Sequence, residues 1–293
     1  MITWQEFLEA RTTGQAPARI GVLGLAFDAN SSFRRGAAQA PPLIRAAFQS
    51  EAANTWSENG TDLSAKDIFA DLGDYRFKAS VMQDTVAHLA GDVLEQGLHL
   101  LSLGGDHSLT YPLVQAISKQ YPDLTLVHID AHGDLYDNFD NNPHSHASPF
   151  ARIMEAGLVG HLLQLGIRTL NGHQREQVAR FQVEVIEMRH WQHDDVLKRI
   201  ANIDSPVYLS LDIDGLDPAF APGVSHREAG GLTTRQVLDV IHALRVPIIA
   251  ADIVEFNPQE DLPKLDSNGL TAMLTGKLFK EVAAQMLANG LPS

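Results

Sequence analysis

Residues 124–134 read LTLVHIDAHGD, a mainly apolar run that ends in a cluster of Asp, His and Gly. A short apolar run with this ending is typical of a buried strand whose last residues reach a polar edge of a sheet. Alternate residues of an extended segment point the same way, so Asp130, His132 and Asp134 are expected to converge. The stretch therefore predicts a buried strand and, at its carboxyl end, side chains suited to binding a metal ion.

The same pattern recurs along the chain and indicates the fold class. Further apolar runs that end in polar clusters lie at Ile20–Phe27, His99–Leu103, Leu162–Ile167, Val207–Leu211 and Pro247–Val254. Helical patterns are expected at Val81–Gln96, Pro112–Lys119, Phe150–Ala156, Gln174–Arg180, Thr233–Leu244 and Thr271–Leu287. Apolar strands that alternate with helices predict an α/β protein with a parallel sheet covered on both faces. An open sheet and a closed barrel both fit this pattern.

Composition limits the class of protein. The chain has 293 residues, no cysteine and a formal charge of −14. The lack of cysteine excludes Cys-ligated zinc and thiol nucleophiles, and the acidic balance argues against a nucleic-acid partner. Met1–Ala10 predicts a short amphipathic helix rather than a secretory signal, and Ile20–Phe27 is far shorter than the ~18 residues of a membrane span. We expect a cytoplasmic protein without membrane contact, in which residues 1–293 form a single domain.

Two further strand ends extend the candidate metal site. His107 follows the strand at His99–Leu103, and Asp212 and Asp214 follow the strand at Val207–Leu211. One Asp after a strand is typical of a turn or helix cap, but the agreement of three strand ends favours a metal site. Four carboxylates in one crevice repel one another unless cations lie among them, and two divalent ions would cancel their charge. Carboxylate and imidazole ligands suit Mn(II), and also Zn(II), Fe(II) or Ni(II).

The expected chemistry is hydrolysis, because two metal ions lower the pKa of a shared water until hydroxide is available near neutral pH. Motifs of serine hydrolases, phosphate loops and dinucleotide-binding folds are missing from the sequence. Neither Lys264 nor Arg227 has a spacing that demands a role as an anion clamp. Glu255 follows the strand at Pro247–Val254 and suits a planar cation such as a guanidinium; its alternative role is capping the next helix. The polar loop at Tyr136–Ser148 contains His144 and His146, and a histidine beside the crevice can carry protons to a departing amine. Of the two, His146 lies nearer to the start of an expected helix.

Three motifs resemble those of the ureohydrolases, the arginase/agmatinase family. They are GGDHS at residues 104–108, DAHGD at 130–134 and SLDIDGLDP at 210–218. Finer segments look most like plant-type arginases: SHAS at 145–148, FARIME at 150–155, APGVSH at 221–226 and DIVEFNP at 252–258. The resemblance covers about Gly21 to Ala288.

This resemblance implies a three-layer α/β/α sandwich with a mostly parallel central sheet, two Mn(II) per subunit (or Ni(II) or another divalent metal), and a homotrimer or homohexamer. His107 and Asp134 would bind one metal, His132 and Asp214 the other, and Asp130 and Asp212 would bridge them. His146 falls on the family's proton-shuttling histidine and Glu255 on its guanidinium-binding glutamate. Asp134 would also accept a hydrogen bond from the attacking water species.

The substrate is expected to be a small cationic guanidino compound. L-Arginine, cleaved to L-ornithine and urea, comes first; agmatine, cleaved to putrescine and urea, and guanidinobutyrate follow. Two alternatives from other classes are an inactive guanidino-binding subunit and a metallohydrolase of phosphate esters or acetylated amines. Gly133 departs from the Thr or Pro that is frequent in the family. Asn142 is our candidate for binding the rest of the substrate, with Tyr136, Asn138 and Asn171 also near.

Overall fold

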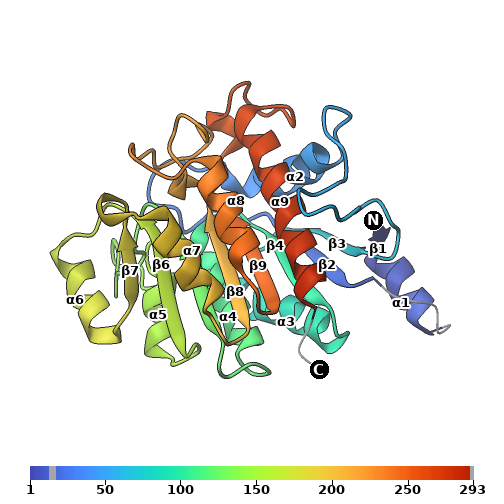
Figure 1. The fold of residues 1–293 in the computed structure, drawn as a ribbon. Coiled ribbons are helices and arrows are strands. Elements are labelled where there is room, and N and C mark those ends of the chain that lie inside the picture. Colours follow the sequence, from blue (N-terminus) through green and yellow to red (C-terminus); the bar gives the residue numbers. More distant parts are fainter. Residues whose placement is uncertain (13–17, 291–293) are drawn as a thin grey trace.

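The computed structural model describes residues 1–12 and 18–290, and its centre is a twisted sheet of nine parallel strands (Figure 1). Their order across the sheet is β1-β3-β2-β4-β9-β8-β5-β6-β7. The strands are β1 (Ile2–Thr3), β2 (Ile20–Leu25), β3 (Phe69–Tyr75), β4 (His99–Leu103), β5 (Thr125–Ile129), β6 (His161–Ile167), β7 (Glu184–Glu187), β8 (Val207–Asp212) and β9 (Ile248–Val254). The first and last strands of this order are free edges, so the sheet is open and not a barrel.

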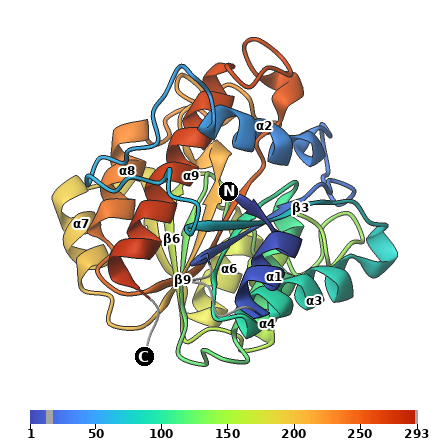
Figure 2. The same ribbon diagram turned by 90° about the vertical axis from the view of Figure 1, so that its right-hand side faces the viewer.

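Helices cover both faces of the sheet and complete three layers (Figures 1 and 2). One face carries α2 (Ala40–Phe48), α7 (His193–Ala201), α8 (Thr234–Ala243) and α9 (Leu270–Asn289). The other carries α1 (Trp4–Thr12), α3 (Met82–Glu95), α4 (Thr110–Ile117), α5 (Pro149–Glu155) and α6 (Gly172–Phe181). The predicted α/β/α sandwich with a mostly parallel sheet is confirmed.

Each face has its own apolar core, because successive side chains of a strand point to opposite sides. In β5, Val127 and Ile129 belong to the core beneath α8 and α9, whereas Leu126 belongs to the core beneath α3 and α4. A strand that is buried on both faces has to be apolar at nearly every position, which is the pattern seen in its sequence. Among the described residues no helix is long and apolar enough to cross a membrane.

The sequence pattern did not predict the strands β3 and β7, because charged residues interrupt them. The strand β3 contains Asp71 and Asp74, and both carboxylates bind the guanidinium of Arg45 on α2. The edge strand β7 has a glutamate at each end, and Glu184 binds Arg199 on α7. Their partners neutralise these charges in three dimensions, but the sequence pattern alone shows only polar interruptions.

The strand order explains how distant motifs meet. After β4 the chain continues to β5, and the two positions between these strands are filled later by β9 and β8. Four strands from three separate parts of the sequence therefore lie side by side in the order β4-β9-β8-β5. Ligands of open parallel sheets bind beyond the carboxyl ends of the strands at such a reversal of order.

Candidate metal centre and active site

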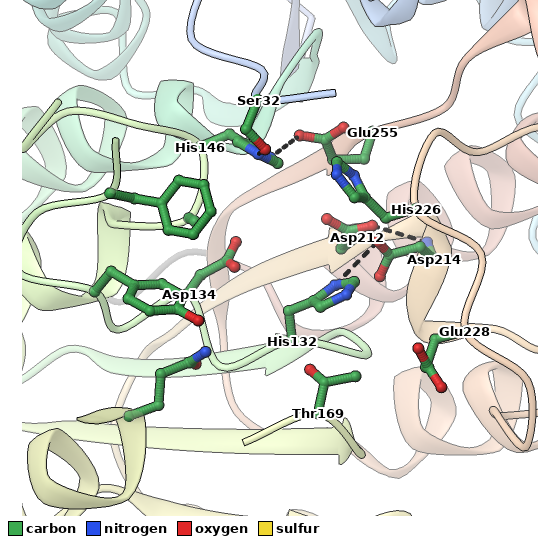
Figure 3. A pocket seen from close by; sticks show the side chains of 14 residues that line it. Ser32, His132, Asp134, His146, Thr169, Asp212, Asp214, His226, Glu228 and Glu255 are labelled. Carbon is green, nitrogen blue, oxygen red and sulfur yellow. Dashed lines mark hydrogen bonds and ion pairs between the residues drawn. The ribbon is translucent and has the colours of Figure 1, made fainter. Parts of the chain in front are cut away.

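The carboxyl ends of the four central strands surround a cavity of about 310 Å³ (Figure 3). The predicted residues Asp134, His146 and Glu255 are in its wall. The complete lining is Ser32, His132, Asp134, Tyr136, Phe139, His146, Ala147, Thr169, Gln174, Asp212, Asp214, His226, Glu228 and Glu255. All side chains that the sequence proposed for metal binding lie in this wall or directly against it.

The first group of ligands is centred on the fully buried His107. Its Nδ1 atom lies 3.3, 3.2 and 3.0 Å from carboxylate oxygens of Asp130, Asp134 and Asp212, respectively. These three residues come from the ends of β5 and β8, so the group exists only because those strands are adjacent to each other and close to β4.

The second group is centred on His132. Its Nδ1 atom lies 3.3 Å from Oδ1 of Asp130 and 3.2 Å from Oδ2 of Asp214. Asp130 faces both groups, because its other oxygen, Oδ2, is the one beside His107. This is the arrangement required of a carboxylate that bridges two ions. The second oxygen of Asp212, by contrast, accepts the backbone N–H of Asp214 at 2.8 Å.

Three observations indicate that divalent cations fit between these side chains. The Nδ1 atom of His107 is buried without a hydrogen-bond partner, although carboxylate oxygens surround it. Neighbouring ligand atoms of an octahedral ion with bonds of about 2.1 Å are about 3 Å apart, close to the spacings seen here. Burial and the charges of Asp130 and Asp214 raise the pKa of Asp212 well above its ordinary value. Positive charge among the carboxylates would relieve that repulsion.

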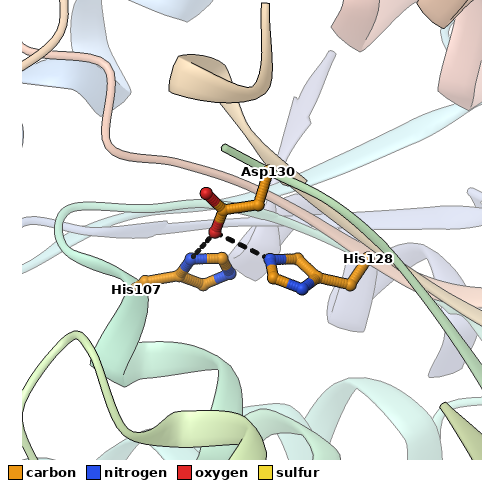
Figure 4. A group of neighbouring side chains, drawn as sticks. All are labelled: His107, His128 and Asp130. Carbon is orange, nitrogen blue, oxygen red and sulfur yellow. Dashed lines mark hydrogen bonds and ion pairs between the residues drawn. The ribbon is translucent and has the colours of Figure 1, made fainter. Parts of the chain in front are cut away.

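Behind the first group lies His128, which the sequence analysis did not single out (Figure 4). Its Nε2 atom is 2.8 Å from Oδ2 of Asp130, and its Nδ1 atom is 3.0 Å from Nε2 of Gln164. The side chain of Gln164 also donates to the carbonyl of Gly133 at 2.7 Å. His128 therefore links the orientation of Asp130 to the turn that follows it. Strand alternation could have revealed it, because it shares the face of Asp130.

Glu255 and His146 form a pair above the metal ligands (Figure 3). The Oε1 atom of Glu255 lies 3.1 Å from Nδ1 of His146 and accepts the backbone N–H of His107 at 3.0 Å. Burial disfavours the charged imidazole, but the hydrogen bond and charge of Glu255 outweigh it and raise the pKa of His146 to about 9. The Nε2 atom of His146 lies 2.8 Å from Oγ of Ser32.

The backbone places two of these carboxylates in an uncommon conformation. Asp134 and Glu255 have φ angles of 47° and 61°, in the left-handed region that non-glycine residues seldom adopt. Each costs roughly 1–2 kcal/mol relative to the right-handed region. Such residues persist where surrounding contacts hold them, and they concentrate at functional sites. For Glu255 one such contact is the bond from its N–H to the carbonyl of Gly105, 2.9 Å long.

Gly105 itself is required by a close approach of two strand ends. A Cβ at this position would lie 1.6 Å from the carbonyl oxygen of Phe27, which accepts the N–H of Asp106. No L side chain fits there without moving the backbone. The glycine thus lets the turn before His107 pack against the end of β2.

Of the candidate substrate-binding residues in the loops, some line the cavity and others do not. Tyr136 lines the cavity, and its hydroxyl accepts a hydrogen bond from the side chain of Asn171. Asn142 is not among the lining residues; its side-chain amide donates to Oδ1 of Asn30 at 3.3 Å, so its role in substrate binding stays a prediction. Lining residues that sequence reasoning did not assign include Ser32, His226, Glu228, Thr169 and Gln174. Ser32, Thr169, His226 and Glu228 lie in loops and Gln174 lies in α6, and no shared sequence pattern marks them.

Comparison with known proteins agrees with this geometry. A model described as the arginase family matches residues 18–284. "Arginase 1, mitochondrial" of Arabidopsis thaliana is 42% identical over 289 residues, which are 94% of this chain and 83% of the relative. "Agmatinase" of Serratia proteamaculans (strain 568) is 34% identical and covers 89% of this chain and 85% of its own length. The solved arginase from Medicago truncatula superimposes with a TM-score of 0.88 at 37% identity, over 96% of this chain and 92% of that one.

Proposed function

Because the chain belongs to the arginase family of ureohydrolases, we propose that it hydrolyses L-arginine to L-ornithine and urea, with agmatine as the alternative substrate. The single observation that carries this proposal is the joint presence, in one cavity, of two ligand groups and the Glu255–His146 pair. The predicted resemblance to plant-type arginases is confirmed by the similarity to plant relatives.

Glu255 binds the guanidinium in this proposal. Both of its contacts fall on Oε1, and within the described part of the chain its Oε2 atom has no hydrogen-bond or ion-pair partner. Oε2 is therefore available to a guanidinium N–H, which forms a charge-assisted bond. If the guanidinium bonded to both carboxylate oxygens, Oε1 would have to accept a third donor. We therefore expect one strong hydrogen bond, from a guanidinium N–H to Oε2. The buried carboxylate retains its negative charge because His146 holds its pKa below the ordinary value against the effect of burial.

His146 holds the proton that the departing amine needs. Protonated on both ring nitrogens, it donates from Nδ1 to Glu255 and from Nε2 to Ser32. Release of that proton to the amine makes the amine a good leaving group. Asp134 lines the same cavity and, in this proposal, accepts a hydrogen bond from the attacking water. The charge of Asp134 also favours the protonated form of His146.

Two Mn(II) ions are the proposed cofactors. His107 and Asp134 would hold one, His132 and Asp214 would hold the other, and Asp130 and Asp212 would contribute to both. When bound, the ions supply a water whose pKa is lowered towards neutrality. Ni(II) or another divalent ion with the same ligand preference is the alternative. We further propose that residues 1–293 act as one catalytic domain and assemble as a homotrimer or homohexamer. Cytoplasmic location stays a prediction, since several plant relatives are named as mitochondrial arginases.

The test is urea release from arginine, agmatine, guanidinobutyrate, guanidinopropionate and guanidine, each with Mn(II) and with Ni(II). Urea from arginine or agmatine supports the proposal, and the ratio of the two rates decides between them. Absence of urea from every compound would favour the inactive binding subunit, which calorimetric titration with arginine would then detect. Replacing Asp130 and Asp212 together by Asn should abolish turnover and the thermal stabilisation that Mn(II) gives. Turnover that survives this double change would rule out the metal-dependent reaction.

A further inference from the structure

Besides Glu255 and the aspartates of the metal site, the cavity wall contains a further acidic side chain, that of Glu228. Glu228 lies beside Thr169, and His132 and Asp214 separate it from Glu255 (Figure 3). Glu255 and Glu228 are therefore carboxylates at two separate parts of one cavity.

The side chain of Glu228 is free to act on a ligand. It is exposed, and its carboxylate has no hydrogen bond or ion pair to any described residue. Its backbone, however, is anchored, because its carbonyl accepts bonds of 2.7 and 3.2 Å from the guanidinium of Arg168. The carboxylate is thus held at the rim of the cavity by a fixed main chain.

No described Lys or Arg side chain balances Glu228 within the cavity. The lining, taken over the residues that the structure describes, contains neither Lys nor Arg. Arg168 lies close by, but its charge is directed at main-chain carbonyls and not at the cavity. Besides Glu228 these carbonyls belong to Gly166, Asp214, Gly215 and Leu216.

A neutral amide also lines the cavity. The side chain of Gln174 is 3% exposed, and its Oε1 atom is buried without a hydrogen-bond partner. A buried acceptor without a partner gains free energy when a ligand donates to it. The cavity therefore offers a ligand a second acceptor besides the carboxylate of Glu228.

We propose that Glu228 binds the positive charge at the far end of the substrate, so that the cavity selects guanidino compounds that also carry an ammonium group. The proposal rests on the proposed function of the same site. Agmatine carries such a group alone, and arginine carries it beside a carboxylate. Guanidinobutyrate ends in a carboxylate without an ammonium group, which Glu228 repels and which no Lys or Arg of the described lining receives. Selection is by charge at the rim, and it is weakened by salt because the carboxylate is exposed.

The experiment compares kcat/KM for agmatine, arginine, butylguanidine and guanidinobutyrate. The variants are Glu228→Gln, Glu228→Lys and, as a control, Glu176→Gln, which removes an exposed charge of α6 that does not line the cavity. Glu228→Gln should lower kcat/KM for agmatine about two- to fivefold, as expected for an exposed ion pair, and leave butylguanidine unchanged. Glu228→Lys should lower kcat/KM for agmatine further and raise kcat/KM for guanidinobutyrate. Glu176→Gln should change none of the four ratios.

Salt gives a second measurement on the same variants. The preference of the unaltered protein for agmatine over butylguanidine should decrease as NaCl is raised from about 0.05 to 0.5 M, and the preference of Glu228→Gln should not. Equal effects of Glu228→Gln on charged and neutral substrates, or none on any, would overturn the role of Glu228 while leaving the hydrolytic function intact. Absence of urea from all four compounds with the unaltered protein would overturn both proposals.

Discussion

The Oγ atom of Ser210 lies 2.9 Å from Nε2 of His107, and this contact determines which ring nitrogen faces the carboxylates. Ser210 donates its own hydrogen to Oδ1 of Asp252, at 2.7 Å. Its oxygen therefore accepts from the Nε2–H of His107, which leaves Nδ1 as the atom directed at Asp130, Asp134 and Asp212. Hydrogen bonds of this kind orient a metal-binding histidine and fix its tautomer.

Ser210→Ala should weaken metal binding by about tenfold or more, because the imidazole loses the partner that orients it. The measurement is the Mn(II) content left after dialysis against a graded series of chelator concentrations. Ser102→Ala is a matched control. Ser102 on β4 and Ser210 on β8 are the register neighbours of Asp252 on the two adjacent strands. Unlike the hydroxyl of Ser210, that of Ser102 is buried without a hydrogen-bond partner. We expect Ser102→Ala to retain its metal; equal losses from both variants would contradict the role of Ser210.

Glu255→Gln should lower kcat/KM for a guanidino substrate by roughly 10²–10³-fold, since it removes a buried carboxylate from a charge-assisted contact. Metal content should stay unchanged, because none of the proposed ligands is altered. Glu281→Gln provides the control: Glu281 is also fully buried and also bonded to a histidine, His242, but on α9 and away from the cavity. That variant should lose stability and keep its kcat/KM. A Glu255→Gln protein of normal activity would refute the assignment of Glu255.

Gly133→Ala should disturb the cavity through Gln174. A Cβ at residue 133 would lie 2.6 Å from Oε1 of Gln174 and 2.7 Å from Cδ2 of Leu170, so both side-chain ends have to move. The displaced amide should raise KM several-fold. The added methyl group and the side chain of Gln174 compete for the same space. In a protein that already carries Gln174→Ala, Gly133→Ala should therefore raise KM by a smaller factor than it does alone. Additive effects of the two changes on KM would show that the alanine acts elsewhere.

The ion pair between Glu58 and Arg235 should make stability depend on pH. Two hydrogen bonds from Arg235, of 2.7 and 2.9 Å, lower the pKa of Glu58 from 4.5 to about 2. A lowered carboxyl pKa stabilises the fold above pH 4.5, and this stabilisation is lost as the pH falls towards 2. Both groups are partly exposed, so a double-mutant cycle should give a coupling free energy of up to about 1 kcal/mol at pH 7.

The cycle uses Glu58→Gln and Arg235→Gln, with urea unfolding at pH 7 and pH 4. The coupling should be smaller at pH 4, where part of the stabilisation is already lost. Asp195 and Lys198 form a comparison pair, because both are highly exposed and their single contact is 3.3 Å long; their coupling should be near zero at either pH. A Glu58–Arg235 coupling that is unchanged or larger at pH 4 would contradict the lowered pKa.

Several features of this protein are determined by local sequence. The strand β5 is mainly apolar because both of its faces are buried, and the residues directly after it place His132 beside Asp130. The helix α8 begins at a capping box formed by Thr233 and Gln236. Each of these depends on residues within a few positions of one another, so the sequence pattern alone predicts it.

Other features were decided only when distant segments packed together. β3 forms although Asp71 and Asp74 interrupt its apolar pattern, because Arg45 binds both carboxylates. The choice of an open sheet over a barrel depends on which strands pair, and the placing of β8 and β9 between β4 and β5 brings Ser210 to His107. The tautomer of that histidine depends on Ser210 and Asp252. The position of Glu228 depends on Arg168, which binds its main-chain carbonyl. In both cases the partners are far apart in the chain. Local sequence patterns do not specify such contacts, because they form only after the strand order is established.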